Sequence, residues 1–195
     1  MQKGLVLLAA LFFFSCNNQD TQKPGAAAPV VLTGTSGHSA AFNQSFKAAL
    51  HTYYELRDQF ITENTAGIDT TASLLITAVN RILVDSVSGD STIVLIAKTF
   101  TEGIRAELIG LKGERDMEEK RKSFQMVGEQ LYDLIRTVQY DQEVIYHQYC
   151  PMAFNNEGAT WLSASSEIRN PYLPAKMPHC GEVQDSIDLR IKKNN

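Results

Sequence analysis

Four stretches of the chain place apolar residues three or four positions apart, the spacing of one face of an amphipathic helix. The stretches cover about residues 39–63, 69–85, 92–112 and 116–138. Their apolar positions include Phe42, Phe46, Leu50 and Phe60 in the first and Phe124, Leu131 and Val138 in the last. Four helices with short connections predict an antiparallel four-helix bundle.

Small and polar residues suggest where these helices begin and end. Gly67 is expected to end the first helical region, and Asp69 is the candidate N-cap of the second helix. Asp116 has Glu119 three residues later, as in a capping box, and is expected to begin the fourth helix.

After about residue 139 the pattern changes to short runs of aromatic and β-branched residues. Val144–Cys150 and Thr160–Ser163 are candidate strands, and Asn155–Gly158 and Asn170–Pro171 between and after them are typical of turns. We therefore expect a mainly α fold with a small, turn-rich, β-containing C-terminal piece. The expected single domain covers residues 38–183, with the bundle in 38–139, the Cys/Met-rich segment in 140–183 and a polar tail in 184–195.

The N-terminal residues have the layout of an export signal. Lys3 precedes the apolar run Gly4–Phe14, which is too short to span a bilayer, and Ser15 comes directly before Cys16. This resembles the lipobox of bacterial lipoproteins, so residues 1–15 are predicted to be a signal peptide, with Cys16 lipidated and residues 16–37 a flexible linker. An ordinary secretory signal is the alternative. The predicted location is the cell envelope, lipid-anchored on the periplasmic side of the outer membrane.

Net charge gives no indication of nucleic-acid binding, since the chain is mildly acidic at −4 and its basic residues are not clustered into a patch. His51 lies beside the apolar stripe of the first predicted helix, and we assign it no function.

Soft ligands gather near the C-terminus, where two thiols, two thioethers and an imidazole fall within about thirty residues. They are Cys150, Met152, Met177, His179 and Cys180, with His147 as a further candidate. Sulfur ligands select soft metals, copper(I) above all. With Cys16 lipidated, the remaining two cysteines could instead form a disulfide in an oxidising compartment. The closed loop of about 31 residues would add about 3.5–4 kcal/mol of stability by chain entropy.

A catalytic role is not expected. His147 and Cys150 face opposite sides of a strand, and the two cysteines are not in a Cys-x-x-Cys arrangement. We therefore predict that the chain is not an enzyme.

Ordered motifs in the C-terminal segment resemble the DUF3347 family. They are Tyr149–Ala153, Gly158–Ser163, Ile168–Tyr172 and Met177–Gly181, with Glu119–Phe124 upstream. The chain departs from the family pattern at Leu173–Pro174, where an aromatic residue and a glycine are usual. The resemblance implies a bacterial envelope lipoprotein or a domain fused to periplasmic adaptors of heavy-metal efflux systems. It also implies a metal-linked context, chiefly copper, and heavy-metal efflux components as partners.

Two hypotheses follow. In the first, the lipoprotein binds copper(I) for capture or hand-over in metal homeostasis or efflux. In the second, it is a non-catalytic structural or protein-interaction domain pinned by a Cys150–Cys180 disulfide, with Met152, Met177 and Trp161 packed in a small core.

Overall fold

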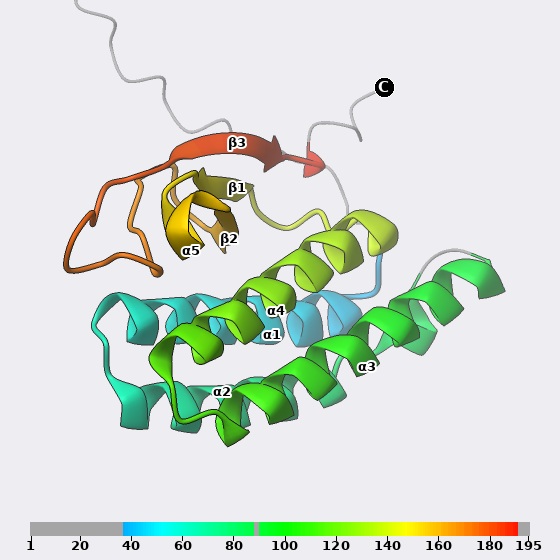
Figure 1. The fold of residues 1–195 in the computed structure, drawn as a ribbon. Coiled ribbons are helices and arrows are strands. Elements are labelled where there is room, and N and C mark those ends of the chain that lie inside the picture. The colour runs from blue at the N-terminus through cyan, green and yellow to red at the C-terminus, as the bar shows by residue number, and fades with distance from the viewer. Residues whose placement is uncertain (1–36, 88–89, 191–195) are drawn as a thin grey trace, which may run out of the picture. The chain divides into compact units, whose positions relative to one another are not determined.

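The computed structural model describes residues 37–87 and 90–190, so the predicted signal peptide, Cys16 and most of the linker lie outside the described residues. Four long helices dominate this part of the chain (Figure 1). They are α1 (Ala40–Ile61), α2 (Thr65–Asn80), α3 (Ser91–Gly113) and α4 (Met117–Val138), with a short 3-10 turn η1 (Val84–Ser86) after α2. Consecutive helices pack side by side with short connections, which confirms the predicted bundle.

The prediction for the start of α2 is wrong. The helix begins at Thr65, and Asn64 rather than Asp69 is its N-cap, with the Asn64 side chain accepting from the Gly67 amide at 3.1 Å. Gly67 therefore lies in the first turn of α2 and does not end α1. Asp116 is the N-cap of α4 as predicted, accepting from the Glu118 and Glu119 amides. The Glu119 carboxylate pairs with Lys122 at 2.8 Å, so only half of the predicted capping box is formed.

The core of the bundle is made by the apolar stripes that the spacing predicted. Its largest members include aromatic rings of α1 and α4 packed against each other, with Tyr53 stacked on Phe124 at 5.2 Å between centroids and Phe60 tilted on Phe124 at 4.8 Å. Burial of such side chains supplies most of the stability of the packed helices.

A buried lysine joins the adjacent ends of three helices. Lys120 of α4 is only 2% exposed, and its ammonium donates to the Asp69 carboxylate of α2 at 2.7 Å and to the Leu111 carbonyl of α3 at 2.9 Å. The Leu111 carbonyl belongs to the last turn of α3, where it also accepts from the C-cap amide of Glu114 at 3.3 Å. Asp69 of α2 therefore pairs with Lys120 of α4 and does not cap α2.

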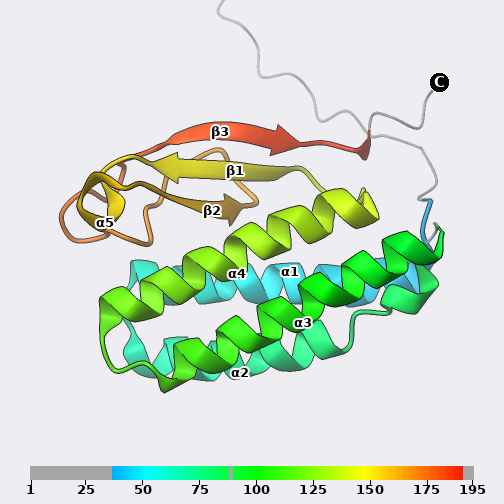
Figure 2. The same ribbon diagram turned by 45° about the vertical axis from the view of Figure 1, so that its right-hand side comes forward.

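The C-terminal part forms a three-stranded antiparallel sheet (Figures 1 and 2). Its strands are β1 (Ile145–Cys150), β2 (Ala159–Ser163) and β3 (Glu182–Ile187), in the order β2-β1-β3, with the short turn α5 (Ala153–Asn156) between β1 and β2. Two of these strands match the predicted ones closely. β3 continues to Ile187, so the sheet extends beyond the boundary expected at residue 183.

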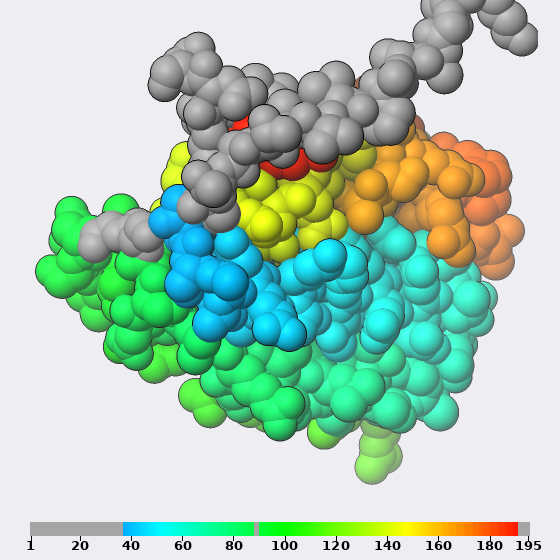
Figure 3. All heavy atoms as spheres, turned by 180° about the vertical axis from the view of Figure 1, so that it is seen from behind, coloured from blue at the N-terminus to red at the C-terminus, as the bar shows by residue number. Residues whose placement is uncertain are grey.

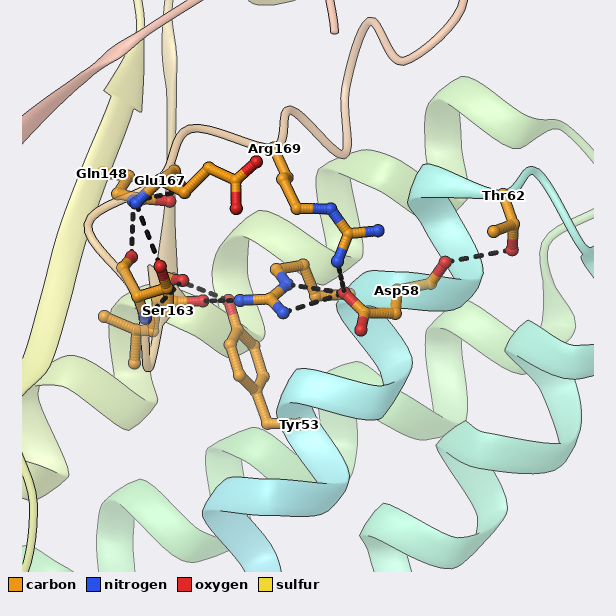
Figure 4. A network of polar contacts seen from close by, with 10 residues as sticks. Tyr53, Asp58, Thr62, Gln148, Ser163, Glu167 and Arg169 are labelled. Atoms are coloured by element: carbon orange, nitrogen blue, oxygen red, sulfur yellow. Dashed lines mark hydrogen bonds and ion pairs between the residues drawn. The ribbon is translucent and has the colours of Figure 1, made fainter. Parts of the chain in front are cut away.

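The free edge of β2 is covered by α1. The Leu162 amide donates to the Tyr53 hydroxyl at 3.2 Å, and the Leu162 carbonyl accepts from Arg57 at 3.5 Å (Figure 4). Tyr53 and Arg57 are one helical turn apart, so one face of α1 satisfies both backbone groups of this edge residue. A Cβ at Gly128 of α4 would lie 2.8 Å from the Tyr53 hydroxyl, so only glycine leaves room for this arrangement.

The loop after β2 is tied to the sheet by a buried glutamine. The Gln148 side chain of β1 is fully buried and donates to the carbonyls of Ser165 and Glu167 at 2.9 and 3.1 Å (Figure 4). Further along the same loop, Arg169 reaches the Asp58 carboxylate at 3.6 Å. These contacts fix the path of the chain from β2 toward the second cysteine.

Seen from behind, α1 and α2 form the surface below the C-terminal sheet and its loops (Figure 3). A groove of about 520 Å³ lies between these helices, with Leu74 and Leu83 of its lining exposed. Its lining contains no cysteine or histidine, so the soft ligands of the sequence lie elsewhere.

Candidate functional site

The fold brings the two C-terminal cysteines into contact. Cys150 is the last residue of β1, and Cys180 lies just before β3, where Tyr149 is paired with Glu182. Antiparallel pairing therefore aligns two residues that are thirty positions apart, and their Sγ atoms lie 2.7 Å from each other. Both are free cysteines in the structure.

The two sulfurs differ in their surroundings. Cys150 is fully buried at the end of the central strand β1, whereas Cys180 is partly exposed. Burial, and then the contact with Cys150, raises the pKa of the Cys180 thiol, while the Met152 backbone amide acts in the opposite direction. The Cys180 thiolate is therefore less favoured than that of an ordinary cysteine.

Asn170 positions Cys180. Its side chain is buried and donates to the Cys180 carbonyl at 2.9 Å, while its carboxamide oxygen accepts from the Tyr172 and Leu173 amides. Its backbone amide donates to the Pro178 carbonyl at 2.9 Å. The sequence indicated only a turn at Asn170–Pro171; the structure adds that Asn170 holds the loop on which Cys180 lies.

Gly181 allows the close approach of this loop to the sheet. Its φ is 139°, and a Cβ there would lie 2.7 Å from the Tyr149 carbonyl oxygen and 2.9 Å from the Trp161 ring. A side chain at this position would push Cys180 away from Cys150.

The two methionines flank the cysteine pair along the chain and are exposed. Met152 is 43% exposed and Met177 is 41% exposed. β1 ends at Cys150, as does the predicted strand, and Met152 beyond it is the N-cap residue of α5. The Met177 carbonyl accepts from the Cys180 amide at 3.1 Å, so one turn joins these two residues. Exposure also excludes both thioethers from the small core of the second hypothesis, while Trp161 is buried.

The two histidines are placed differently. His179 is exposed, and its Nδ1 lies 3.1 Å from the Ile168 carbonyl oxygen. Nε2 is therefore the ring nitrogen of His179 that could serve as a metal ligand. His147 stacks on Tyr132 of α4 with ring centroids 4.2 Å apart, and burial lowers its pKa. At about 3.3 Å per residue along a strand, His147 is too far from Cys150 for the two side chains to bind the same metal ion.

No three or more His, Cys, Asp or Glu side chains form a metal-holding group in the described ranges 37–87 and 90–190. His179 as placed therefore does not complete a set with Cys150 and Cys180. Ligands beyond the two thiols would have to come from the thioethers or from a shift of the loop that carries His179.

A cleft of about 260 Å³ adjoins this segment. Phe154, Asn155, Tyr172 and Lys176 contribute to its lining, together with the Glu63–Arg121 ion pair at 2.9 Å. Phe154, Asn155 and Asn156 all have positive φ, an unusual conformation for three successive residues other than glycine. The chain after Cys150 thus reverses through a left-handed turn beside an open cleft.

A family model described as a protein of unknown function, DUF3347, matches residues 49–143. The chain belongs to the DUF3347 family. The matched residues run from within α1 to the residues before β1, so the family assignment is confirmed while the motifs from Tyr149 to Gly181 lie beyond the match. No curated protein and no solved structure matches the chain.

Proposed function

We propose that this DUF3347 protein is a cell-envelope lipoprotein that binds a soft metal, copper(I), for capture or hand-over in metal homeostasis or efflux. The proposal rests on one observation, the contact between the Cys150 and Cys180 sulfurs beside two exposed methionines. It is a binding function and involves no catalytic step. Membrane attachment through Cys16 and heavy-metal efflux components as partners are parts of the same proposal.

The donor atoms suit the ion. Two thiolates and two thioethers are soft ligands, which favour copper(I) over the hard cations that prefer oxygen. Met152 and Met177 are free to move because neither is buried. Labile thioethers beside firmly held thiolates would let a partner exchange ligands during hand-over.

The spacing of the sulfurs sets a condition on binding. Two thiolates on one tetrahedral metal ion lie about 3.8 Å apart, given metal–sulfur distances of about 2.3 Å. The observed separation is 2.7 Å, so the sulfurs must part by about 1 Å. Cys150 is fixed within the sheet, so the movement falls to the side chain of the partly exposed Cys180.

Proton release accompanies this binding. Thiols must lose their protons to become metal ligands, and burial raises the pKa of Cys180. The affinity for copper(I) is therefore expected to increase with pH.

The second candidate is a non-catalytic structural or protein-interaction domain in which Cys150 and Cys180 form a disulfide. The short sulfur separation and the burial of Cys150 favour it. A disulfide would hold β3 and its loop to the centre of the sheet. The exposed methionines have no role in this candidate.

Competition with a chromophoric copper(I) chelator tests the first candidate. The anaerobically reduced full chain is expected to remove copper(I) from the chelator. Cys150→Ser and Cys180→Ser should each lower the affinity at least about tenfold, or about 1.4 kcal/mol. A Met152→Leu/Met177→Leu variant should weaken binding less.

Met126→Leu is the matched control, since Met126 on α4 is also 43% exposed but lies away from the cysteines in the sequence. It should leave the affinity unchanged. Failure of the reduced chain to compete, or an unchanged affinity in Cys150→Ser, would overturn the proposal.

A further inference from the structure

The Cys150–Cys180 pair combines contact with unequal access. A reagent or a partner protein can approach Cys180, which is partly exposed on the loop before β3. It cannot approach Cys150, which is fully buried at the end of the central strand β1, where it pairs with Ala159 of β2. Contacting thiols of unequal access suit thiol–disulfide exchange, because the accessible sulfur can meet the partner and the buried one can resolve the mixed disulfide.

We infer that Cys150 and Cys180 form a reversible thiol–disulfide pair in which Cys180 is the sulfur that exchanges with a partner, and that the disulfide form closes the metal site. The second half rests on the proposed function, whereas the first half does not.

Oxidation by a disulfide compound proceeds in two exchanges. The Cys180 thiolate attacks one sulfur of the compound, which forms a mixed disulfide and releases one thiol. The Cys150 thiol, already in contact, then loses its proton and attacks the Cys180 sulfur, which releases the second thiol. Two electrons and two protons pass from the pair to the compound.

Reduction reverses this path with a dithiol protein as the partner. One partner thiolate attacks the exposed Cys180 sulfur, and Cys150 leaves as a thiol after taking a proton. The second partner thiol attacks the partner sulfur of the mixed disulfide, which frees Cys180 and leaves the partner oxidised. The partner class implied is a thiol–disulfide oxidoreductase with two cysteines.

The geometry of the loop that carries Cys180 is compatible with both the disulfide and the metal-bound form. Asn170 holds the Cys180 carbonyl, and the Cys180 amide is bonded to Met177, so the backbone at Cys180 is fixed while its side chain faces Cys150. A disulfide needs a sulfur separation of about 2.05 Å, whereas a shared metal ion needs about 3.8 Å. The two states exclude each other, so the redox state would decide whether the site can take metal.

Single-cysteine variants of the full chain test the unequal access. Cys150→Ala leaves Cys180 and Cys180→Ala leaves Cys150, and both are treated with Ellman's reagent and with glutathione disulfide. The thiol in Cys150→Ala is expected to react at least about tenfold faster than the one in Cys180→Ala. Peptide mapping by mass spectrometry distinguishes reaction at Cys16 from reaction at the other cysteine. In denaturant, where both thiols are exposed, the reaction rates of the two variants should become equal.

The wild-type chain should behave differently from both variants. Glutathione disulfide is expected to yield a Cys150–Cys180 disulfide, with the mass of two hydrogen atoms lost, and any trapped adduct should map to Cys180. Equal rates for the two variants, a first adduct at Cys150, or a wild-type chain that forms no internal disulfide would each overturn the inference.

Competition for copper(I) by the oxidised and the reduced wild-type chain tests whether the disulfide closes the metal site. The oxidised chain is expected to lose at least about tenfold in affinity relative to the reduced chain. Equal affinity would refute closure. If the reduced chain binds no copper(I), the proposed function falls, while the exchange result at Cys180 still decides the first half.

Discussion

Replacing Tyr53 with phenylalanine tests how the helices hold the sheet. The Tyr53 hydroxyl is the hydrogen-bond acceptor of the Leu162 amide at the outer edge of β2, and the tyrosine is fully buried. Water cannot replace a hydroxyl lost at such a site. Tyr53→Phe therefore leaves a buried backbone donor without its acceptor while it keeps the ring that stacks on Phe124.

A buried donor left without a partner costs about 1–3 kcal/mol. For a protein of this size each kcal/mol lowers Tm by about 2–4 °C. A loss of about 2 kcal/mol thus predicts a Tm lower by about 4–8 °C. The Leu162 amide should also exchange its hydrogen faster in the variant.

The neighbouring Tyr54 provides a matched control. Its hydroxyl is buried but has no hydrogen-bond partner among the described residues. Tyr54→Phe removes the same oxygen without breaking a bond, so its stability should be unchanged or slightly higher. Thermal and urea unfolding of both variants, followed by circular dichroism, measure the difference. An equal loss in the two variants, or no loss in Tyr53→Phe, would refute the assignment.

Two further predictions concern buried charge. Asp69→Ala leaves the Lys120 ammonium buried without its carboxylate and should lower the free energy of unfolding by about 2–3 kcal/mol, below the range for fully buried pairs because Asp69 is partly exposed. Lys120→Met should cost less, about 1–2 kcal/mol, since Asp69 can be hydrated and the Leu111 carbonyl keeps the Glu114 amide as a donor; urea unfolding in which Lys120→Met proves the more harmful change would contradict this order. Burial lowers the pKa of His147, so the folded chain binds fewer protons there than the unfolded chain, and stability is full above about pH 6.5 and declines as the pH falls through the folded pKa. His147→Gln should remove this part of the decline in thermal melts between pH 7.5 and 5, and an identical pH profile in the variant would exclude it.

Local patterns in the sequence were sufficient for the helices and two of the strands. Apolar spacing placed α1, α3 and α4, and the aromatic and β-branched run ending at Cys150 placed β1. Such signals depend on neighbours a few residues away, and burial on one face makes them strong. The start of α2 failed because Asn64 and Asp69 are both good N-caps, and Asp69 is instead used by Lys120, fifty-one positions away.

The candidate site was only half predictable, because it too depends on contacts between residues far apart in the sequence. The residue types marked Cys150 and Cys180 as a possible pair, but their contact depends on the pairing of β1 with β3, and β3 has few apolar residues to reveal it. The exposure of Met152 follows from the end of β1 at Cys150, and the role of Asn170 follows from a loop whose path is set by Gln148. None of these long-range contacts leaves a local signal.

The match to the family covers less of the chain than the folded unit does. A fragment limited to residues 49–143 would lose the first turns of α1, including Phe42 and Phe46, and the whole sheet. Tyr53 and Arg57 would then face water with no strand edge to cover. Fragments for expression should therefore begin before Ala40 and end after Ile187. Relatives compared only over the matched residues would be classified without Cys150 and Cys180, on which the proposed metal binding depends.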